Sequence, residues 1–271
     1  MSNPEIALLR KRANREDSLS PSEEAVYDWY LKNPRFREIR VSRNRLQEMD
    51  DFLGIYDFKE IQRDKEKVQK LRDLETEKDK TQRGEIFETI VGEYGDMAEW
   101  FGDMTIAEVL EYDDRINHVD LVLSGKNKQG ESVFLALDCT VSENNKNIEK
   151  KISRIANEIK RGRLTQIKYY KHPDTDQALP LSNIPRIILV IDKERLKRLC
   201  EDIIKVIQRK KGSNRELAQN QIQFELLNQM KSQLENQREL AKNSSAEIRQ
   251  KIDLALGKVL ELIEQKKFVA S

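Results

Sequence analysis

The stretch DLVLSGKNKQGESVFLALDCT, residues 120–140, has the pattern of a β-hairpin with an acidic residue at each end. Its two apolar runs, 121–123 and 133–139, are short and partly β-branched. The polar segment KNKQGES between them contains a glycine, and this composition favours a turn. If the turn occupies this segment, Asp120 lies opposite Asp138 when the strands pair.

The two acidic residues indicate a site of some kind. Asp138 ends an apolar run, where packing alone favours a hydrophobic residue, so its carboxylate needs a polar partner or a metal. Side chains alternate along a strand, so Asp138 and Thr140 share one face while Leu137 and Cys139 share the other. Two carboxylates joined by a hairpin form a hard-oxygen site suited to Mg²⁺. We therefore expect Asp120 and Asp138 to hold a metal ion.

Composition limits the class of protein. Of the 271 residues, 36% are charged and 38% are hydrophobic, which predicts a modest core with much solvated helix. The net charge is +1, so any basic surface has to be local. Two histidines make a Cys/His zinc site unfavourable, and the two cysteines, without CxxC spacing, fit reduced thiols. No apolar run approaches the roughly 20 residues of a membrane span, so we expect a cytoplasmic protein without a membrane segment.

Residues 1–82 predict a charged helical extension. The sequence SPSE, beginning at Ser20, matches a helix-starting capping box with proline at the first helical position. A second helix is expected over 42–52. The segment 57–82 is dense in Lys, Arg, Glu and Asp, which is typical of a long solvated or partner-facing helix.

The next segment leads into the hairpin. Apolar residues recur with helical spacing over 85–101, which predicts a core helix ending near Gly102. A short strand is expected near 109–112. The acidic pair Asp113 and Asp114 that follows is interpreted as a turn without a functional role.

Beyond the hairpin, the sequence predicts a helix over 144–161, a short helix over 164–171, a strand over 186–191 and a helix over 193–208. The first of these helices has a buried face formed by Ile148, Ile152, Ile155 and Ile159. The strand RIILVI is apolar without alternation, as in a central strand that is covered on both faces.

Residues 212–271 form a Gln-, Asn-, Glu- and Lys-rich tail with apolar residues at heptad-like spacing. The segment Asn-Ser-Ser at 243–245 separates two helices, which predicts an antiparallel helical hairpin. Two interpretations stay open at this point: a segment that dimerises or binds a protein partner, and a pair of helices packed on the core.

The order of these elements, helix, strand, hairpin strands, helix and strand, resembles the αβββαβ core of the restriction-endonuclease-like, PD-(D/E)XK, nuclease superfamily over 83–211. The resemblance implies an α/β fold with a small mixed sheet, flanked by the helical extensions 1–82 and 212–271. In that superfamily an acid begins the second strand and a (D/E)xK tripeptide ends the third. Asp120 matches the first element, and the tripeptide from Asp138 to Thr140 matches the second.

Further family elements have candidates in this sequence. Glu88 matches the acid that the preceding helix often contributes. Gln166 and Tyr170, in QIKYY, match the QxxxY element of the RecB-like branch. One departure is important: Thr140 occupies the lysine position and supplies no positive charge. Some members carry this lysine on the next helix, for which Lys151 is the candidate and Lys146 the runner-up.

The resemblance implies a nuclease that hydrolyses phosphodiester bonds with Mg²⁺ or Mn²⁺, with DNA as the favoured substrate. Asp120, Asp138 and the Cys139 carbonyl would hold the metal, and Lys151 would position the attacking water. A basic stretch would meet the phosphates. The nucleic-acid-binding residues expected from this stretch are Lys146, Lys150, Arg154, Arg161, Arg163, Gln166 and Tyr170.

Two other functions are compatible with the sequence. The first is an inactive nuclease fold that binds nucleic acid or protein through its helical arms, which the threonine at position 140 favours. The second is a helical scaffold around a small α/β unit. Metal binding at Asp120 and Asp138 separates the three, since only the nuclease requires it.

Overall fold

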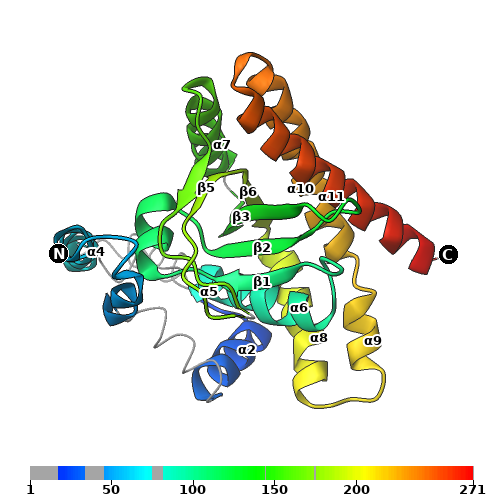
Figure 1. Ribbon diagram of the computed structural model, residues 1–271. Coiled ribbons are helices and arrows are strands. Elements are labelled where there is room, and N and C mark those ends of the chain that lie inside the picture. The colour runs from blue at the N-terminus through cyan, green and yellow to red at the C-terminus, as the bar shows by residue number, and fades with distance from the viewer. Residues whose placement is uncertain (1–17, 34–45, 75–81, 144, 174, 271) are drawn as a thin grey trace, which may run out of the picture.

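The computed structural model describes residues 18–33, 46–74, 82–143, 145–173 and 175–270. It has a mixed α/β fold with a four-stranded sheet, of strand order β1-β2-β3-β6, and a two-stranded sheet of β4 and β5 (Figure 1). In the larger sheet β1, β2 and β3 are antiparallel, and β6 is parallel to β3. The strands are β1 (Thr105–Glu108), β2 (Leu121–Lys126), β3 (Ser132–Val141), β4 (Thr165–Ile167), β5 (Leu181–Ile184) and β6 (Arg186–Ile191).

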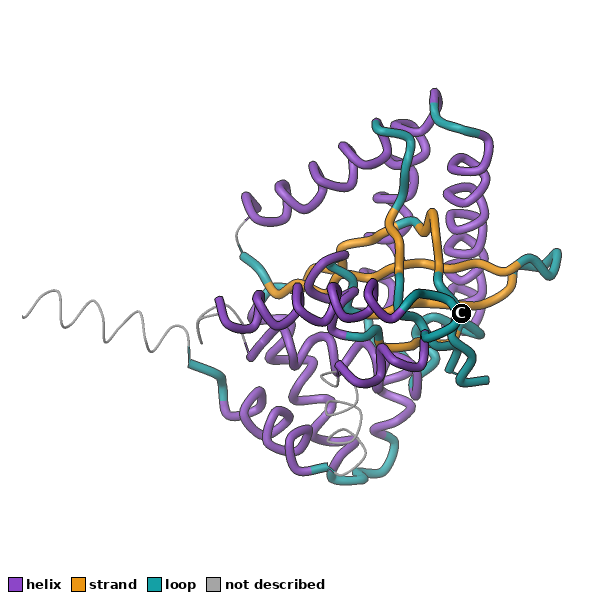
Figure 2. Tube along the Cα trace, turned by 60° about the vertical axis from the view of Figure 1, so that its left-hand side comes forward, coloured by secondary structure: helices purple, strands orange, loops and turns teal. Residues whose placement is uncertain are grey.

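Helices surround these strands, which lie at the centre of the molecule (Figure 2). The α-helices are α2 (Pro21–Lys32), α4 (Phe58–Leu74), α5 (Gln82–Thr89), α6 (Gly95–Met97), α7 (Asn145–Lys160), α8 (Lys193–Ile207), α9 (Ser213–Ala218), α10 (Ile222–Leu240) and α11 (Ala246–Ala270). Shorter segments are the 3₁₀ helices η1 (Leu46–Phe52) and η4 (Ala241–Asn243) and the π-helical turns η2 (Ile90–Tyr94) and η3 (Asp113–Asn117). Within the described residues, no helix is long and apolar enough to cross a membrane.

The central hairpin forms as the sequence predicts. β2 pairs with β3 from Leu121 opposite Leu137 to Lys126 opposite Ser132. The register ends at Leu121, and the Asp120 N–H donates to the carbonyl of Leu137, the residue before Asp138, at 2.8 Å. The predicted hairpin is therefore confirmed, with both acids at its open end, although no strand pair joins Asp120 to Asp138.

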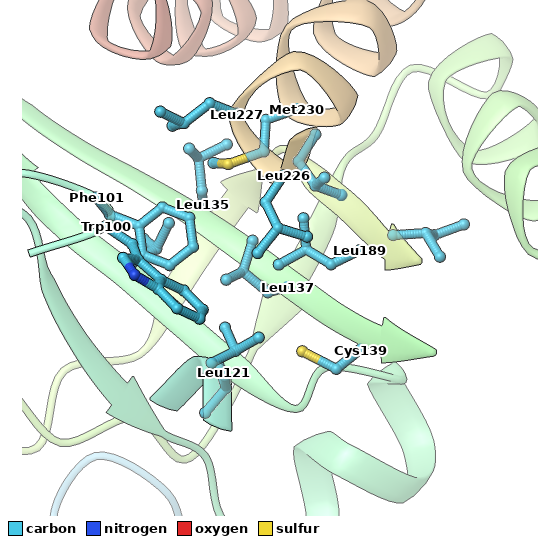
Figure 3. Packing of buried hydrophobic residues seen from close by; sticks show 14 of the residues in the cluster. Trp100, Phe101, Leu121, Leu135, Leu137, Cys139, Leu189, Leu226, Leu227 and Met230 are labelled. Carbon is cyan, nitrogen blue, oxygen red and sulfur yellow. The ribbon is translucent and has the colours of Figure 1, made fainter. Parts of the chain in front are cut away.

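The two faces of the hairpin pack against different partners. On one face, Leu121, Leu137 and Cys139 join the main hydrophobic core, which α10 covers with Leu226 and Met230 (Figure 3). On the other face lies a smaller cluster of Val122, Ala136, Ile167 and Tyr170 and their neighbours. Alternation along the strands places Asp138 and Thr140 on this second face, away from the main core.

Strand β6 lies at the edge of the sheet, so its prediction as a central strand is wrong. Its outer edge is covered by three glutamines of α10, at positions 229, 233 and 237. Gln229 pairs with the N–H and C=O of Val190, and Gln233 pairs with those of Ile188. Gln237 donates to the Arg186 carbonyl at 2.7 Å. The glutamine side chains thus replace a neighbouring strand, which satisfies the edge and keeps it from pairing with another chain.

Simple geometry explains this pairing. Four residues of an α-helix rise about 6 Å, and two residues of a strand rise about 6.6 Å. Glutamines at every fourth helical position therefore stay in step with every second residue of β6. α10 also packs along α11 as an antiparallel hairpin (Figure 1), and both helices contact the sheet. Of the two interpretations of the tail, the structure has the helices packed on the core.

The predicted helix over 85–101 is interrupted. The chain forms α5, a π-turn and α6, and it leaves the helix after Met97. Beyond that point Glu99 has a positive φ of 53°, and Trp100 folds back to donate its main-chain N–H to the Gly95 carbonyl. The indole of Trp100 is fully buried and donates to the Leu217 carbonyl at 3.0 Å. This long-range contact overrides the helical periodicity.

Two further predictions are wrong. The strand expected at 109–112 is β1, four residues earlier, because 105–108 is the segment in register with β2. The helix expected at 164–171 is strand β4, which pairs with β5. The backbone N–H groups of Lys168 and Tyr169 donate to the Asp113 carboxylate instead of to helical carbonyls, which explains the difference.

The N-terminal helices pack on the core. α2 begins with the predicted capping box at Ser20 and Glu23, which is confirmed, and it packs against α5 and α8. η1 covers residues 46–52 of the predicted second helix, whose first part lies outside the described residues. α4 buries Ile61 and Val68 in a third hydrophobic cluster, so this charged helix is anchored through one face. Residues 75–81 of the predicted charged helix also lie outside the described residues.

Candidate active site

The end of β3 carries a carboxylate that contacts a lysine from the following helix. Asp138 is only 6% exposed. Lys151 of α7 places its Nζ 2.6 Å from Asp138 Oδ1 and 2.7 Å from Thr140 Oγ1. The Thr140 hydroxyl in turn donates to Asp138 Oδ1 at 3.1 Å. Lys151, and not Lys146, therefore makes the contact that was expected of a relocated lysine, and Thr140 helps to hold it.

The second carboxylate lies beside the first strand of the hairpin. Asp120 is half-buried, and its Oδ2 accepts the backbone N–H of Cys139 at 2.6 Å. This bond ties the Asp120 side chain to β3, next to Asp138. The arrangement fits two hard-oxygen ligands on one face of the hairpin. Oδ2 of Asp138 accepts no hydrogen bond from any residue that the structure describes, and this oxygen is the one available to a ligand.

Cys139 contributes only its main chain to this site, because its side chain packs in the core on the opposite face (Figure 3). In an extended strand the N–H and C=O of one residue point to the same side. Since the Cys139 N–H points to Asp120, its carbonyl faces the same strand. The carbonyl is therefore on the correct side to act as the predicted ligand.

Glu88 lies on α5, which packs against β3, and it is half-buried. Across the described ranges, no three side chains of His, Cys, Asp or Glu are grouped closely enough to hold a metal. The structure thus brings together two of the three predicted acids, Asp120 and Asp138, and leaves Glu88 outside a three-acid cluster. Any metal held here would take its remaining ligands from the main chain and from water, as Mg²⁺ commonly does.

Most of the predicted phosphate-binding residues lie along helix α7 and the turn that follows it. A groove of about 720 Å³ runs along it and includes Lys146, Lys150, Arg154, Arg161 and Arg163 in its lining. Glu149 and Glu158 also line this groove, which leaves an excess of positive charge. The predicted basic residues are therefore gathered along a single surface.

The predicted isoleucine face of α7 is buried only in part. Ile155 and Ile159 are buried, Ile148 is half-buried and Ile152 is 45% exposed. Near the end of the helix, Ser244 of the C-terminal hairpin donates to the Ile159 carbonyl at 3.4 Å. The helix is therefore fixed through its C-terminal half, while its first half, with Lys151, borders the site.

The QxxxY prediction is wrong for its tyrosine. Tyr170 is fully buried, and its hydroxyl donates to Ser124 at 3.4 Å, so it does not reach nucleic acid. Tyr169 is buried as well, in the cluster beneath α4. Gln166 is exposed at the middle of β4, because neighbouring side chains of a strand point in opposite directions. Of this pair, only Gln166 is accessible to a ligand.

Two residues that sequence reasoning missed lie beside the site. His118, two residues before Asp120, and Arg186, at the start of β6, line a pocket together with Arg154. Partial burial, followed by the nearby charges of Arg154 and Arg186, lowers the pKa of His118 to about 4, although part of the residue stays exposed. The sequence carries no local signal for either residue, since strand pairing alone brings Arg186 near His118.

Asp113, the first residue of the second acidic pair, has a structural role. Asp113 is fully buried and accepts hydrogen bonds from two main-chain N–H groups, those of Lys168 and Tyr169, and from the Asn117 amide. Burial is the main cause that raises the pKa of Asp113, to about 6. This carboxylate joins η3 to the segment after β4 and does not face the site of Asp138.

Comparisons of the chain with protein-family models, with curated proteins and with solved structures found no match. The functional argument therefore depends on the geometry of the site.

Proposed function

We propose that this chain is a metal-dependent nuclease with a restriction-endonuclease-like core, acting on phosphodiester bonds of nucleic acid, with DNA favoured. The observation that carries the proposal is the contact of Lys151 with Asp138, at 2.6 Å, beside Asp120, whose carboxylate accepts the Cys139 N–H. Two acids and a lysine at the end of a β-hairpin are the groups that the resemblance implies. Here the lysine comes from the following helix.

The arrangement of elements supports the same proposal. When the two-stranded sheet of β4 and β5 is set apart, the order α5, β1, β2, β3, α7 and β6 matches that of an αβββαβ core, and β6 is parallel to β3. The candidate site lies where β3 ends and α7 begins. Both acids and the lysine therefore come from elements that are adjacent in this order.

Asp120 and Asp138 are the proposed ligands of Mg²⁺ or Mn²⁺, with the Cys139 carbonyl as a further one. When bound, such an ion lowers the pKa of a coordinated water and stabilises the charge that develops on the phosphate. The bond from the Cys139 N–H to Asp120 fixes one carboxylate, and Asp138 presents its Oδ2. The chain therefore supplies oxygen ligands that are held before any ion arrives.

Lys151 is the proposed positioning group for the attacking water and for the charge on the phosphate. Its ammonium is held by Asp138 and by the Thr140 hydroxyl, and its side chain is 38% exposed, so it can meet a substrate. Preorganised donors of this kind contribute most where charge develops in the transition state. The basic groove along α7 would hold the phosphates of the strand.

The test is cleavage of single- and double-stranded DNA and RNA with Mg²⁺ or Mn²⁺. We expect Asp138→Asn and Lys151→Met each to reduce the cleavage rate by roughly 10²–10³-fold, because each removes a group that acts on the transition state. Lys128→Met is the matched control. Lys128 is an exposed lysine in the turn of the same hairpin, and we expect its replacement to leave the rate unchanged. Full metal-dependent cleavage by Asp138→Asn would refute the proposed site.

An inactive nuclease fold that binds nucleic acid is the second candidate. The observation that favours it is the ion pair itself, since Lys151 and Thr140 already occupy Oδ1 of Asp138. This candidate predicts that the wild type binds oligonucleotides, cuts none of the four substrates and shows no Mn²⁺ binding by calorimetry.

A further inference from the structure

A small pocket lies near the candidate active site, between the segment 116–118 that precedes β2, α7, and the starts of β4 and β6. Its volume is about 310 Å³, at the small end of the range for ligand pockets. Arg186, Leu164 and Thr165, which are all buried, contribute to its lining. The accessible part of the lining comes from His118, Arg154, Arg163, Gln166 and their neighbours. The pocket therefore has a buried guanidinium and an accessible polar border.

The charges in this pocket are not balanced. Three arginines, at positions 154, 163 and 186, line it with a single carboxylate, Glu158. Arg186 is only 4% exposed, and its Nε is buried without a hydrogen-bond partner in the described part of the chain. Arg186 contacts Glu158 at 3.3 Å and donates to the Asn117 carbonyl at 2.6 Å. A buried guanidinium with an unsatisfied donor carries a free-energy cost that an anion would reduce.

Among the described residues, the two accessible arginines also lack partners. Neither the Arg154 nor the Arg163 guanidinium has a hydrogen bond or an ion pair to any residue within the described ranges. Arg154 lies close enough to Arg186 for their like charges to lower the pKa of Arg186, after the larger effect of burial. Guanidinium groups that repel one another around a small cavity attract a compact, highly charged anion.

The position of the pocket connects it to the proposed chemistry. His118 is two residues from Asp120, and the charges of Asp138 and Lys151 both act on its ring. Arg154, Glu158 and Arg163 line this pocket and also the groove along α7. A nucleic-acid strand that lies in the groove can therefore have its end in the pocket.

We propose that this pocket binds the terminal phosphate monoester of a nucleic-acid strand. The proposal rests on the proposed function, because it assigns the strand end to the same site. A terminal phosphate carries a charge of about −1.5 to −2 at pH 7 and three acceptor oxygens, which suits several guanidinium groups. A phosphate within a strand carries one charge and needs a channel that is open at both ends. The size and the buried part of the pocket fit a strand end and not a duplex.

This assignment implies that the enzyme acts from strand ends. With its terminal phosphate beside His118 and Arg186, a strand would pass the carboxylates of Asp120 and Asp138 close to that end. The nucleotides that follow would lie along α7. We therefore expect short products released from one end, and slower cutting of substrates that have only hydroxyl ends.

The test is a binding experiment on the full-length wild type in EDTA, so that no cleavage occurs. The probes are one fluorescent single-stranded DNA oligonucleotide with a 5′-phosphate, the same strand with a 3′-phosphate, and the same strand with hydroxyl ends, followed by fluorescence anisotropy. We expect one phosphorylated form to bind at least about tenfold more tightly than the hydroxyl form, since charge-assisted contacts are involved. The preferred form gives the polarity.

Arg163→Gln and Arg161→Gln are the matched pair of variants. Both arginines are exposed and both line the groove, but only Arg163 lines the pocket. We expect Arg163→Gln to abolish most of the preference for a phosphorylated end, and Arg161→Gln to keep it. Equal binding of all three probes by the wild type would overturn the proposal, as would an equal loss of preference in both variants. Because cleavage is absent here, a clear end preference would support the pocket even if the chain proved not to cut.

Discussion

Two lysine–carboxylate pairs in this molecule differ in how completely they are enclosed. Lys168 is 17% exposed, and its Nζ lies 2.5 Å from both Glu60 and Asp64 of α4. The ring of Tyr56 lies beneath it at 4.5 Å. Lys151 is 38% exposed and contacts one carboxylate, Asp138, together with a hydroxyl.

The difference separates a structural cluster from a candidate site. The ammonium of Lys168 contacts two carboxylates and an aromatic ring, so no part of its charge is left to bind a ligand. It anchors α4 through Asp64, which also accepts the Tyr169 hydroxyl at 3.1 Å. Asp138 keeps one oxygen unused among the described residues, and its lysine borders a basic groove. An ion pair with a carboxylate therefore does not by itself indicate a functional lysine. An incompletely paired carboxylate beside a cavity does indicate one.

The largest effect on stability is expected from the enclosed pair. Lys168→Met leaves Asp64, which is 2% exposed, with the exposed Lys67 as its remaining cationic partner among the described residues. We expect the free energy of unfolding to fall by about 3–5 kcal/mol, the usual cost of breaking a buried pair from one side. Urea denaturation followed by circular dichroism measures it. A loss below about 1 kcal/mol would show that this cluster is no more structural than the open one.

A second prediction concerns the pH dependence of the same region. The folded pKa of Asp113, about 6, lies above the ordinary value of 3.8, so the folded state binds this proton more tightly than the unfolded state. The resulting stability is fully present below about pH 4 and is lost as the pH rises through 6, by on the order of 3 kcal/mol.

The variant Asp113→Asn removes this titration and provides the reference. The free energy of unfolding of the wild type minus that of Asp113→Asn should decrease from pH 4 to pH 7, as measured by urea denaturation at several pH values. A difference that does not change with pH would contradict a buried, proton-binding Asp113. The hydrogen bonds that Asp113 accepts from main-chain N–H groups would then keep its carboxylate ionised over this whole pH range.

The smallest effect on stability is expected at the open pair. Lys151→Met removes an ion pair whose lysine is more than a third exposed, and such pairs contribute about 0–1 kcal/mol. We expect unfolding to change by less than about 1 kcal/mol, while cleavage falls as proposed above. Thermal unfolding of Lys151→Met beside Lys168→Met makes the comparison direct. Similar losses in both variants would remove the distinction between the two pairs.

Much of the fold could be predicted from local patterns. The hairpin, the capping box at Ser20 and the helices α7 and α8 follow from alternation, turn composition and helical spacing. The wrong predictions share a cause. Strand β4 and the turn after Met97 are set by long-range partners, Asp113 and Leu217, which no local pattern reveals.

The candidate site was predictable to the same extent. The hairpin pattern placed Asp120 and Asp138 at the same end of the hairpin, and helical spacing placed Lys151 beside the buried face of α7. His118 and Arg186 were not predictable, because their proximity depends on how β6 pairs with β3. Tyr170 was misassigned, since the tertiary packing of the segment after β4 decides whether a tyrosine there is buried or exposed.

The glutamines of α10 show where sequence information ends. The sequence by itself determined that residues 222–240 are helical and that RIILVI is a strand, because propensity and periodicity are local. The pairing of Gln229, Gln233 and Gln237 with β6 emerged only in the folded chain. A glutamine-rich helix face predicts contact with solvent. In the folded chain this face instead lies beside a strand edge whose N–H and C=O groups need hydrogen-bond partners. The physical reason is that these hydrogen bonds join distant segments, and neither segment alone specifies its partner.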